Sequence, residues 1–200
     1  MIRDETAERK AATFLLGDNL ERTTQGGGIY TYTSQQGAAA FRDTGSFDAA
    51  GSLSQENAEA FCRDFCKAFS YDTPIFTLDE TGSGTATAVR LWSGTPVFNA
   101  AVTFTIDQGR VLSASGALLP ETGAETSSGQ KPLSAFAALT AFQQMRHASS
   151  SVVSSITEVS LCYELQSTTA APMALVPSWR IVTDTATFYV NCISGTVRRA

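Results

Sequence analysis

Residues 175–197 read "LVPSWRIVTDTATFYVNCISGTV" and combine a proline, a tryptophan, an alternating segment and a glycine. Side chains alternate along a strand, so residues 188–190 ("FYV") place Phe and Val on one face and Tyr on the other. Residues 191–195 then supply the residue types of a turn. The stretch predicts a β-hairpin scaffold, in which Trp179 and Ile181 on the preceding strand anchor a helix. A ligand-binding role for Trp179 is the alternative.

An earlier stretch of the chain has the same pattern. Residues 102–111 ("VTFTIDQGRV") and 186–197 ("ATFYVNCISGTV") share Thr-Phe, an aliphatic residue, Asp or Asn, and then Gly-x-Val. Each stretch follows a segment with helical periodicity, which favours duplication over chance similarity. We therefore expect the two stretches to superpose as hairpins beneath equivalent helices.

Apolar residues recur at three-to-four spacing in three segments, which indicates three helices. The first runs over residues 7–15 and stops at Gly17. The second spans 54–69 with Ser54 as its cap, and the third spans 132–148 with Pro132 in its first turn. The large side chains expected to be mostly buried are Phe61, Phe65, Phe142, Trp179 and Phe188.

The remaining segments alternate and are separated by glycine-containing turns, which is typical of strands. The expected strands include residues 74–79, 85–92, 96–106, 110–119, 156–165, 174–183 and 186–193. Residues 121–131 are polar and predict a linker. The sequence thus predicts an α+β fold of two to three repeated helix-plus-antiparallel-sheet units. An N-terminal lobe would span 1–125 (units 1–53 and 54–120), and a C-terminal unit would span 126–200.

The charge balance argues against nucleic acid as a partner. The net charge is −5 with a pI near 4.9, and lysine occurs only at Lys10, Lys67 and Lys131. Binding to DNA or RNA needs a basic surface that this composition does not provide.

The cysteines do not follow a metal-binding pattern. Cys62 and Cys66 are four residues apart, no CxxC occurs, and His147 is the single histidine. We expect buried, reduced thiols, no metal and no organic cofactor. A Cys162–Cys192 disulfide is the alternative if the strands that carry them are neighbours.

No arrangement typical of an enzyme is evident, so the expected sets of catalytic, cofactor-binding and metal-binding residues are empty. His147 falls near the end of the third helix, away from a serine nucleophile motif. Asp79 and Glu80 are adjacent, so on a strand they would face opposite sides. The glycines at 26–28 lead into a strand rather than a helix, which favours a loop over a phosphate site.

The motifs "PSWRI" (177–181), "FYVN" (188–191) and "SGTV" (194–197) resemble the closing repeat of YycI-type proteins and, more loosely, PepSY-like modules. The front half also resembles the YycI family: a charged amphipathic helix is followed by "YTYTSQQGAAAFRDTGSF" (30–47). "LWSGTPVFNAAVTFTIDQGRV" (91–111) is similar to the middle strands of that family. The four cysteines match no motif of the family.

The resemblance implies a non-catalytic regulatory protein on the extracytoplasmic face of the cell membrane. Its expected partners are a YycH-like companion and a WalK-type sensor histidine kinase, with a membrane anchor upstream of this chain. The alternative is a secreted PepSY-like module that binds a peptide or inhibits a protease. An exposed strand edge, or a groove between sheet and helix, would serve such binding.

Overall fold

The structure is a computed structural model that describes residues 3–54, 57–120, 131–149, 152–167 and 173–200. The helices are α1 (Glu5–Leu16), α2 (Ala58–Ala68) and α3 (Ala135–Ser149). The strands are β1 (Glu21–Gly26), β2 (Ile29–Ser34), β3 (Gly37–Phe41), β4 (Ser46–Gly51), β5 (Ile75–Leu78), β6 (Gly84–Trp92), β7 (Thr95–Asp107), β8 (Arg110–Ala117), β9 (Ile156–Gln166), β10 (Ala174–Thr183), β11 (Thr187–Asn191) and β12 (Val197–Arg199).

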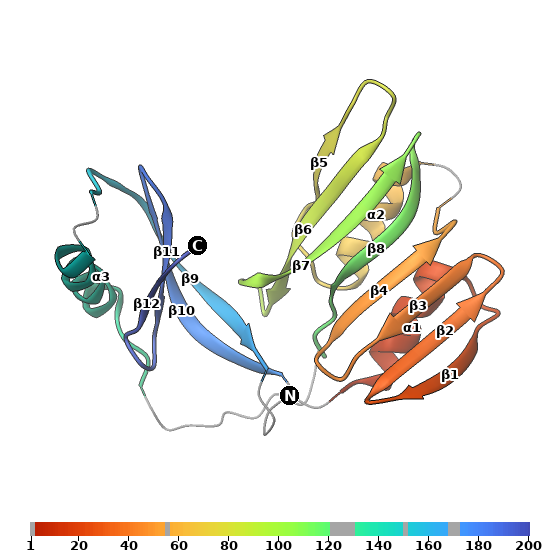
Figure 1. The fold of residues 1–200 in the computed structure, drawn as a ribbon, viewed down its shortest axis with the longest axis horizontal. Helices are drawn as coiled ribbons and strands as arrows, with labels where there is room; N and C mark the ends of the chain where they lie inside the picture. The colour runs from red at the N-terminus through yellow and green to blue at the C-terminus, as the bar shows by residue number, and fades with distance from the viewer. Residues whose placement is uncertain (1–2, 55–56, 121–130, 150–151, 168–172) are drawn as a thin grey trace.

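The described strands form one 12-stranded mixed sheet. Its order is β1-β2-β3-β4-β8-β7-β9-β10-β11-β12, with β6 also pairing with β7 and β5 pairing with β6. The ladders are antiparallel except at the contact of β7 with β9, where Val97 opposes Tyr163 in parallel. Figure 1 shows α1 and α2 beside β1–β8, and α3 beside β9–β12 on the other side of this contact.

The predicted α+β fold of repeated helix-plus-sheet units is wrong. The fold is dominated by strands, with three short helices in the described residues. Strands from different expected units pair with one another. β4 of the first unit pairs with β8 of the second, with Ser46 opposite Ala117 at one end and Ala50 opposite Ser113 at the other. β7 of the second unit contacts β9 of the third. These pairings satisfy backbone groups that separate sheets would leave at open edges. One sheet therefore replaces the separate units.

The predicted duplication has no support in the structure. Residues 102–111 and 186–197 both contain a hairpin, but Asp107 opposes Arg110 across a two-residue turn, whereas Val190 opposes Val197 across a longer one. β7 has 13 residues and pairs with three strands, and β11 has 5 residues and pairs with two. The common chemistry of a strand–turn–strand accounts for the shared pattern. The expected linker lies mostly outside the described residues, so the boundary between 125 and 126 stays a prediction.

Helix α1 begins and ends where its sequence directs. Asp4 caps it, since the Asp4 carboxylate accepts hydrogen bonds of 3.0 Å from the amides of Thr6 and Ala7. Gly17 adopts a φ of 80° at the other end, a conformation that side chains disfavour. The prediction of a helix over residues 7–15 that stops at Gly17 is confirmed.

The start of α1 is fixed to the sheet by Arg3. The Arg3 guanidinium lies 2.6 Å from the Glu8 carboxylate, donates to the carbonyl of Phe41, and stacks 3.8 Å from the Tyr30 ring centre. Burial raises the pKa of the Glu8 carboxyl, and the bond from Arg3 opposes this shift. A buried charge pair thus holds α1 against β2 and β3.

The starts of α2 and α3 differ from the prediction. Asn57 caps α2 by accepting from the amide of Ala60 at 3.1 Å, whereas the Ser54 amide donates to Val111 of β8. Helix α3 begins at Ala135, after Pro132, and the Ser134 hydroxyl accepts from the amide of Ala137 at 3.3 Å. In both helices the side-chain oxygen that satisfies a first-turn amide sets the start.

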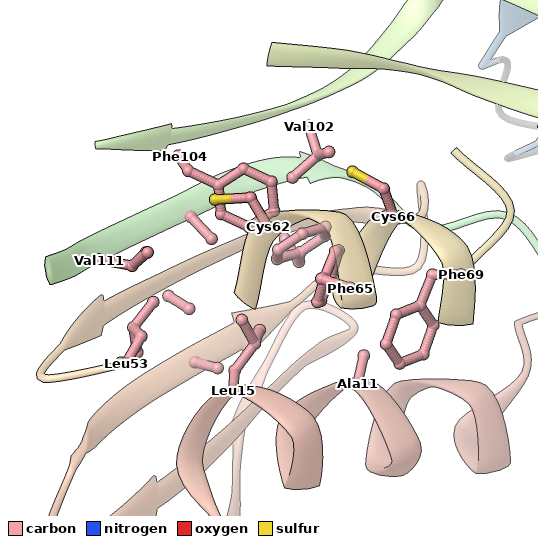
Figure 2. Packing of buried hydrophobic residues seen from close by; sticks show 14 of the residues in the cluster. Ala11, Leu15, Leu53, Cys62, Phe65, Cys66, Phe69, Val102, Phe104 and Val111 are labelled. Atoms are coloured by element: carbon pink, nitrogen blue, oxygen red, sulfur yellow. The ribbon is translucent and has the colours of Figure 1, made fainter. Parts of the chain in front are cut away.

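The largest hydrophobic cluster lies between the first two helices and the strands beside them (Figure 2). Leu15 of α1, Phe65 of α2 and Phe104 of β7 are all fully buried there. A smaller cluster beneath α3 contains Phe142 and Phe188, whose ring centres are 5.0 Å apart. Burial is confirmed for Phe65, Phe142 and Phe188, whereas Phe61 and Trp179 are half-buried.

A third group of contacts joins β7 to β9 and β11. The Asn99 carboxamide donates to the carbonyl of Leu165 and accepts from its amide, both at 2.7 Å, as a paired peptide group would. Phe98 stacks on Tyr189 with ring centres 3.7 Å apart. A small buried cluster around Val97 completes this junction.

Candidate functional site

Three strands in the described part of the sheet pair along one side only: β1, β5 and β12. β1 reads "ERTTQG" and β12 reads "VRR", so both edges carry charged side chains. β5 reads "IFTL" and has none. Because charge on an edge strand opposes pairing with another chain, β5 is the edge best suited to accept an additional strand.

The side chains of β5 are unusually exposed for their size. Ile75 is 75% exposed and Leu78 is 41% exposed. The amide of Asp79 donates to Ser83 at 2.9 Å and closes the β5–β6 hairpin. Since hydrogen-bonding directions alternate along an antiparallel ladder, the backbone groups of Phe76 and Leu78 point away from β6.

A groove of about 520 Å³ lies beside β5, at the N-terminal end of α2. It is lined by Asn57, Ala58, Glu59, Phe76, Leu78, Gly82, Ile106, Gln108, Gly109 and Arg110. Phe76 and Leu78 line the groove, and they are also the two residues of β5 whose backbone groups point away from β6. A strand added to β5 would therefore place every second side chain over this groove.

The rim of the groove is held by hydrogen bonds between two turns and α2. The Ser83 hydroxyl donates to Asp107 at 3.0 Å and accepts from the amide of Gln108 at 3.0 Å. The amide of Gly109 donates to Gly82, and the amide of Ala58 donates to Gly109. These bonds fix the groove before any partner arrives, which lowers the entropic cost of binding.

Asp79 organises the turn that ends β5. Its carboxylate accepts from the hydroxyl and the amide of Thr81, at 2.6 and 2.8 Å, and from the amide of Ser83 at 3.0 Å. The hydroxyl of Thr81, followed by the two amides, lowers the pKa of Asp79. Asp79 and Glu80 both belong to this turn, so the strand expected over residues 74–79 ends one residue earlier, at Leu78.

Acidic side chains flank the uncharged edge on both sides. Asp72 precedes β5, Asp79 and Glu80 follow it, and all three are exposed. The edge therefore combines an apolar centre with negatively charged ends, which complements an extended segment with basic ends.

The residues that the sequence singled out lie elsewhere and do not converge. The Trp179 indole donates to the carbonyl of Leu133 at 2.9 Å and so fixes the approach to α3. Together with Ile181 it packs against the cluster beneath α3, which confirms its predicted anchoring role. His147 is exposed in the last turn of α3, and residues 26–28 join β1 to β2.

All four cysteines are buried free thiols. The condition for a Cys162–Cys192 disulfide is not met, because β10 lies between the two residues: Cys162 opposes Ser178, and the Cys192 amide donates to Pro177. Burial raises the pKa of Cys62, Cys66 and Cys162 to about 12. Burial also raises the pKa of Cys192.

The residues that the structure describes contain no group of three or more His, Cys, Asp or Glu side chains arranged to hold a metal ion. No helix among them has the length and hydrophobicity needed to cross a bilayer.

Sequence reasoning placed a strand at 74–79 but missed its role as an edge. The available signal is the run "IFTL", bounded by Pro74 and by the acidic pair at 79–80. An apolar strand with no charged residue is usually central to a sheet. Only the pairing partners reveal that β5 has one neighbour.

Neither a family model nor a curated protein matches the sequence. Among solved structures, the chain is similar to the C-terminal domain of Bacillus megaterium YpeB, with 13% identity and a TM-score of 0.43 over 98% of this chain and 97% of that one. It is also similar to an uncharacterized protein from Eubacterium rectale ATCC 33656, with 12% identity and a TM-score of 0.49 over 98% of this chain and 76% of that one.

Both TM-scores lie below 0.5, so neither likeness supports a conclusion about the fold or the function of this chain. The resemblance to YycI has no support from these comparisons.

Proposed function

We propose that this protein is a non-catalytic interaction module that binds an extended segment of a partner protein along β5. The observation that supports the proposal is an uncharged edge strand, with Ile75 75% exposed, beside a groove of about 520 Å³. Strand addition of this kind takes affinity from main-chain hydrogen bonds and specificity from pockets for alternate side chains.

The edge defines the partner segment. Phe76 and Leu78 offer outward backbone groups, so the partner pairs with them in an extended conformation. Asp79 follows Asp72 by seven residues, and a nearly extended chain rises about 3.3 Å per residue, so the two carboxylates are separated by roughly 23 Å along the edge. The partner is thus a segment of about seven residues with alternating apolar side chains and Lys or Arg near both ends.

The regulatory role implied by the resemblance to YycI is a more specific version of this proposal. In that version the bound segment belongs to a WalK-type sensor histidine kinase or a YycH-like companion at the extracytoplasmic face of the membrane. Modulation would need only a difference in binding free energy between kinase states of about 1–3 kcal/mol. The edge of β5 is where that difference would arise.

Selection from a displayed library of random peptides tests the strand-addition proposal. We expect the enriched peptides to have alternating apolar residues and basic ends, and to shift the NMR signals of residues 75–78. Leu78→Pro removes an outward amide without breaking the ladder to β6, and should abolish binding. The matched variant Leu78→Ala keeps that amide and should retain part of the affinity.

Three results would overturn the proposal. One is equal binding by Leu78→Pro and Leu78→Ala. Another is selection of peptides that shift only the signals of α3, where Phe136 is 81% exposed. The third is loss of the folded state in Leu78→Ala.

For the kinase version, Ile75→Lys should remove kinase modulation in the native membrane, whereas Lys67→Gln should preserve it.

A further inference from the structure

A second groove lies between α1 and the edge strand β1, remote in sequence from β5. Its volume is about 650 Å³, and its lining is Glu5, Thr6, Arg9, Lys10, Thr13, Leu20, Arg22 and Tyr32. This volume falls within the range of small-molecule sites. The lining combines three cations, two threonine hydroxyls and one carboxylate with the apolar surfaces of Leu20 and Tyr32.

The carboxylate of this groove is already neutralised. Arg22 donates to Glu5 at 2.8 Å, and this bond lowers the pKa of Glu5. Arg22 also stacks 4.4 Å from the Tyr30 ring centre, so its guanidinium is oriented by two contacts. A guanidinium has five donors, and the bond to Glu5 leaves donors for a ligand.

The other two cations, Arg9 and Lys10, are not paired with a carboxylate of any residue that the structure describes. Lys10 lies 5.5 Å from the ring centre of the buried Phe69, and Arg9 and Lys10 are both exposed at the surface of α1. The lining therefore has a charge of +2 in a chain whose net charge is −5.

We propose that this groove binds a small organic anion, such as a carboxylate or a phosphate ester, attached to an apolar ring. The ring contacts Leu20 and Tyr32, and the anionic group lies between Arg9 and Arg22. Arginine suits this role because its planar donors match the oxygens of carboxylate and phosphate. The threonine hydroxyls of α1 supply further hydrogen bonds. This site is independent of the β5 edge, and its failure leaves the interaction proposal untouched.

Phenyl phosphate is a suitable probe, with benzyl alcohol as its neutral counterpart. We expect phenyl phosphate to shift the amide signals of residues 5–13 and 20–22 in a saturable titration, and benzyl alcohol to shift them far less. Arg9→Gln and Arg22→Gln should each weaken binding about fivefold, the size of one exposed charge contact. Lys67→Gln makes the same charge change on α2 and should have little effect.

Salt dependence provides a second readout. Raising the ionic strength from about 0.05 M to about 0.5 M should weaken phenyl phosphate binding, because charge contacts at the surface are screened. The proposal is overturned if benzyl alcohol binds as tightly, if the shifted signals lie outside α1 and β1, or if Arg9→Gln behaves like Lys67→Gln.

Discussion

Phe65 lies at the centre of the largest hydrophobic cluster. It is fully buried in α2. Its ring has five aromatic neighbours with centre distances between 4.6 and 6.1 Å, namely Phe14, Phe47, Phe69, Tyr71 and Phe104. An aromatic side chain buries about 150–250 Å², which at about 25 cal/mol per Å² corresponds to roughly 4–6 kcal/mol. An alanine side chain at this position still buries part of this area, so Phe65→Ala should lower the free energy of unfolding by about 3–5 kcal/mol.

Phe61 provides the matched control, one helical turn earlier on α2. It is half-buried and contacts Phe14 and Phe104, with ring centres at 5.3 and 6.4 Å. Because Phe61 buries about half as much of its side chain as Phe65, Phe61→Ala should lower the free energy of unfolding by about 2 kcal/mol. Urea unfolding of both variants, followed by circular dichroism, measures the difference. Equal losses, or a larger loss in Phe61→Ala, would refute the assignment of Phe65 as the centre of the core.

Three other predictions follow from burial and protonation. Phe142→Ala should lower the free energy of unfolding by about 3–5 kcal/mol, and a loss below roughly 1 kcal/mol in urea unfolding would contradict its buried position. Because the pKa of Asp79 is lowered in the folded state, its turn contributes stability that is present above about pH 4 and lost as the pH falls further. Asp79→Asn should reduce this acid sensitivity in a pH series of unfolding curves, and an unchanged acid limb in this variant would contradict the role of Asp79. The buried thiols of Cys62, Cys66 and Cys162 should react with Ellman's reagent at about pH 8 only after unfolding, and fast reaction of the folded protein would show exposed thiols.

Local structure was largely readable from the sequence, because it depends on neighbouring residues. The apolar periodicity gave all three helices, and glycine-containing turns gave strands close to their observed bounds. The helix starts were less accurate: Ser54 and Asn57 are both good capping residues, and the choice depends on the bond between the Ser54 amide and Val111. That bond is a tertiary contact that the local pattern does not contain.

The arrangement of the sheet was not predictable in the same way. Alternation shows that a segment is a strand, but it does not name its partner. β4 and β8 are separated by α2 and three strands in the sequence, yet they pair along five residues. The interpretation as repeated units failed because it assigned each strand to the helix before it. The β5 edge was missed for the same reason.

The junction between β7 and β9 makes one backbone proton a reporter of docking. The amide of Leu165 donates to the Asn99 side chain of β7. Its exchange with deuterated solvent therefore requires separation of Asn99 from β9, while the ladder between β9 and β10 stays intact. Comparison of the exchange rate of Leu165 with that of a ladder amide such as Cys162, which opposes Ser178 of β10, would separate local undocking from global unfolding in a single spectrum.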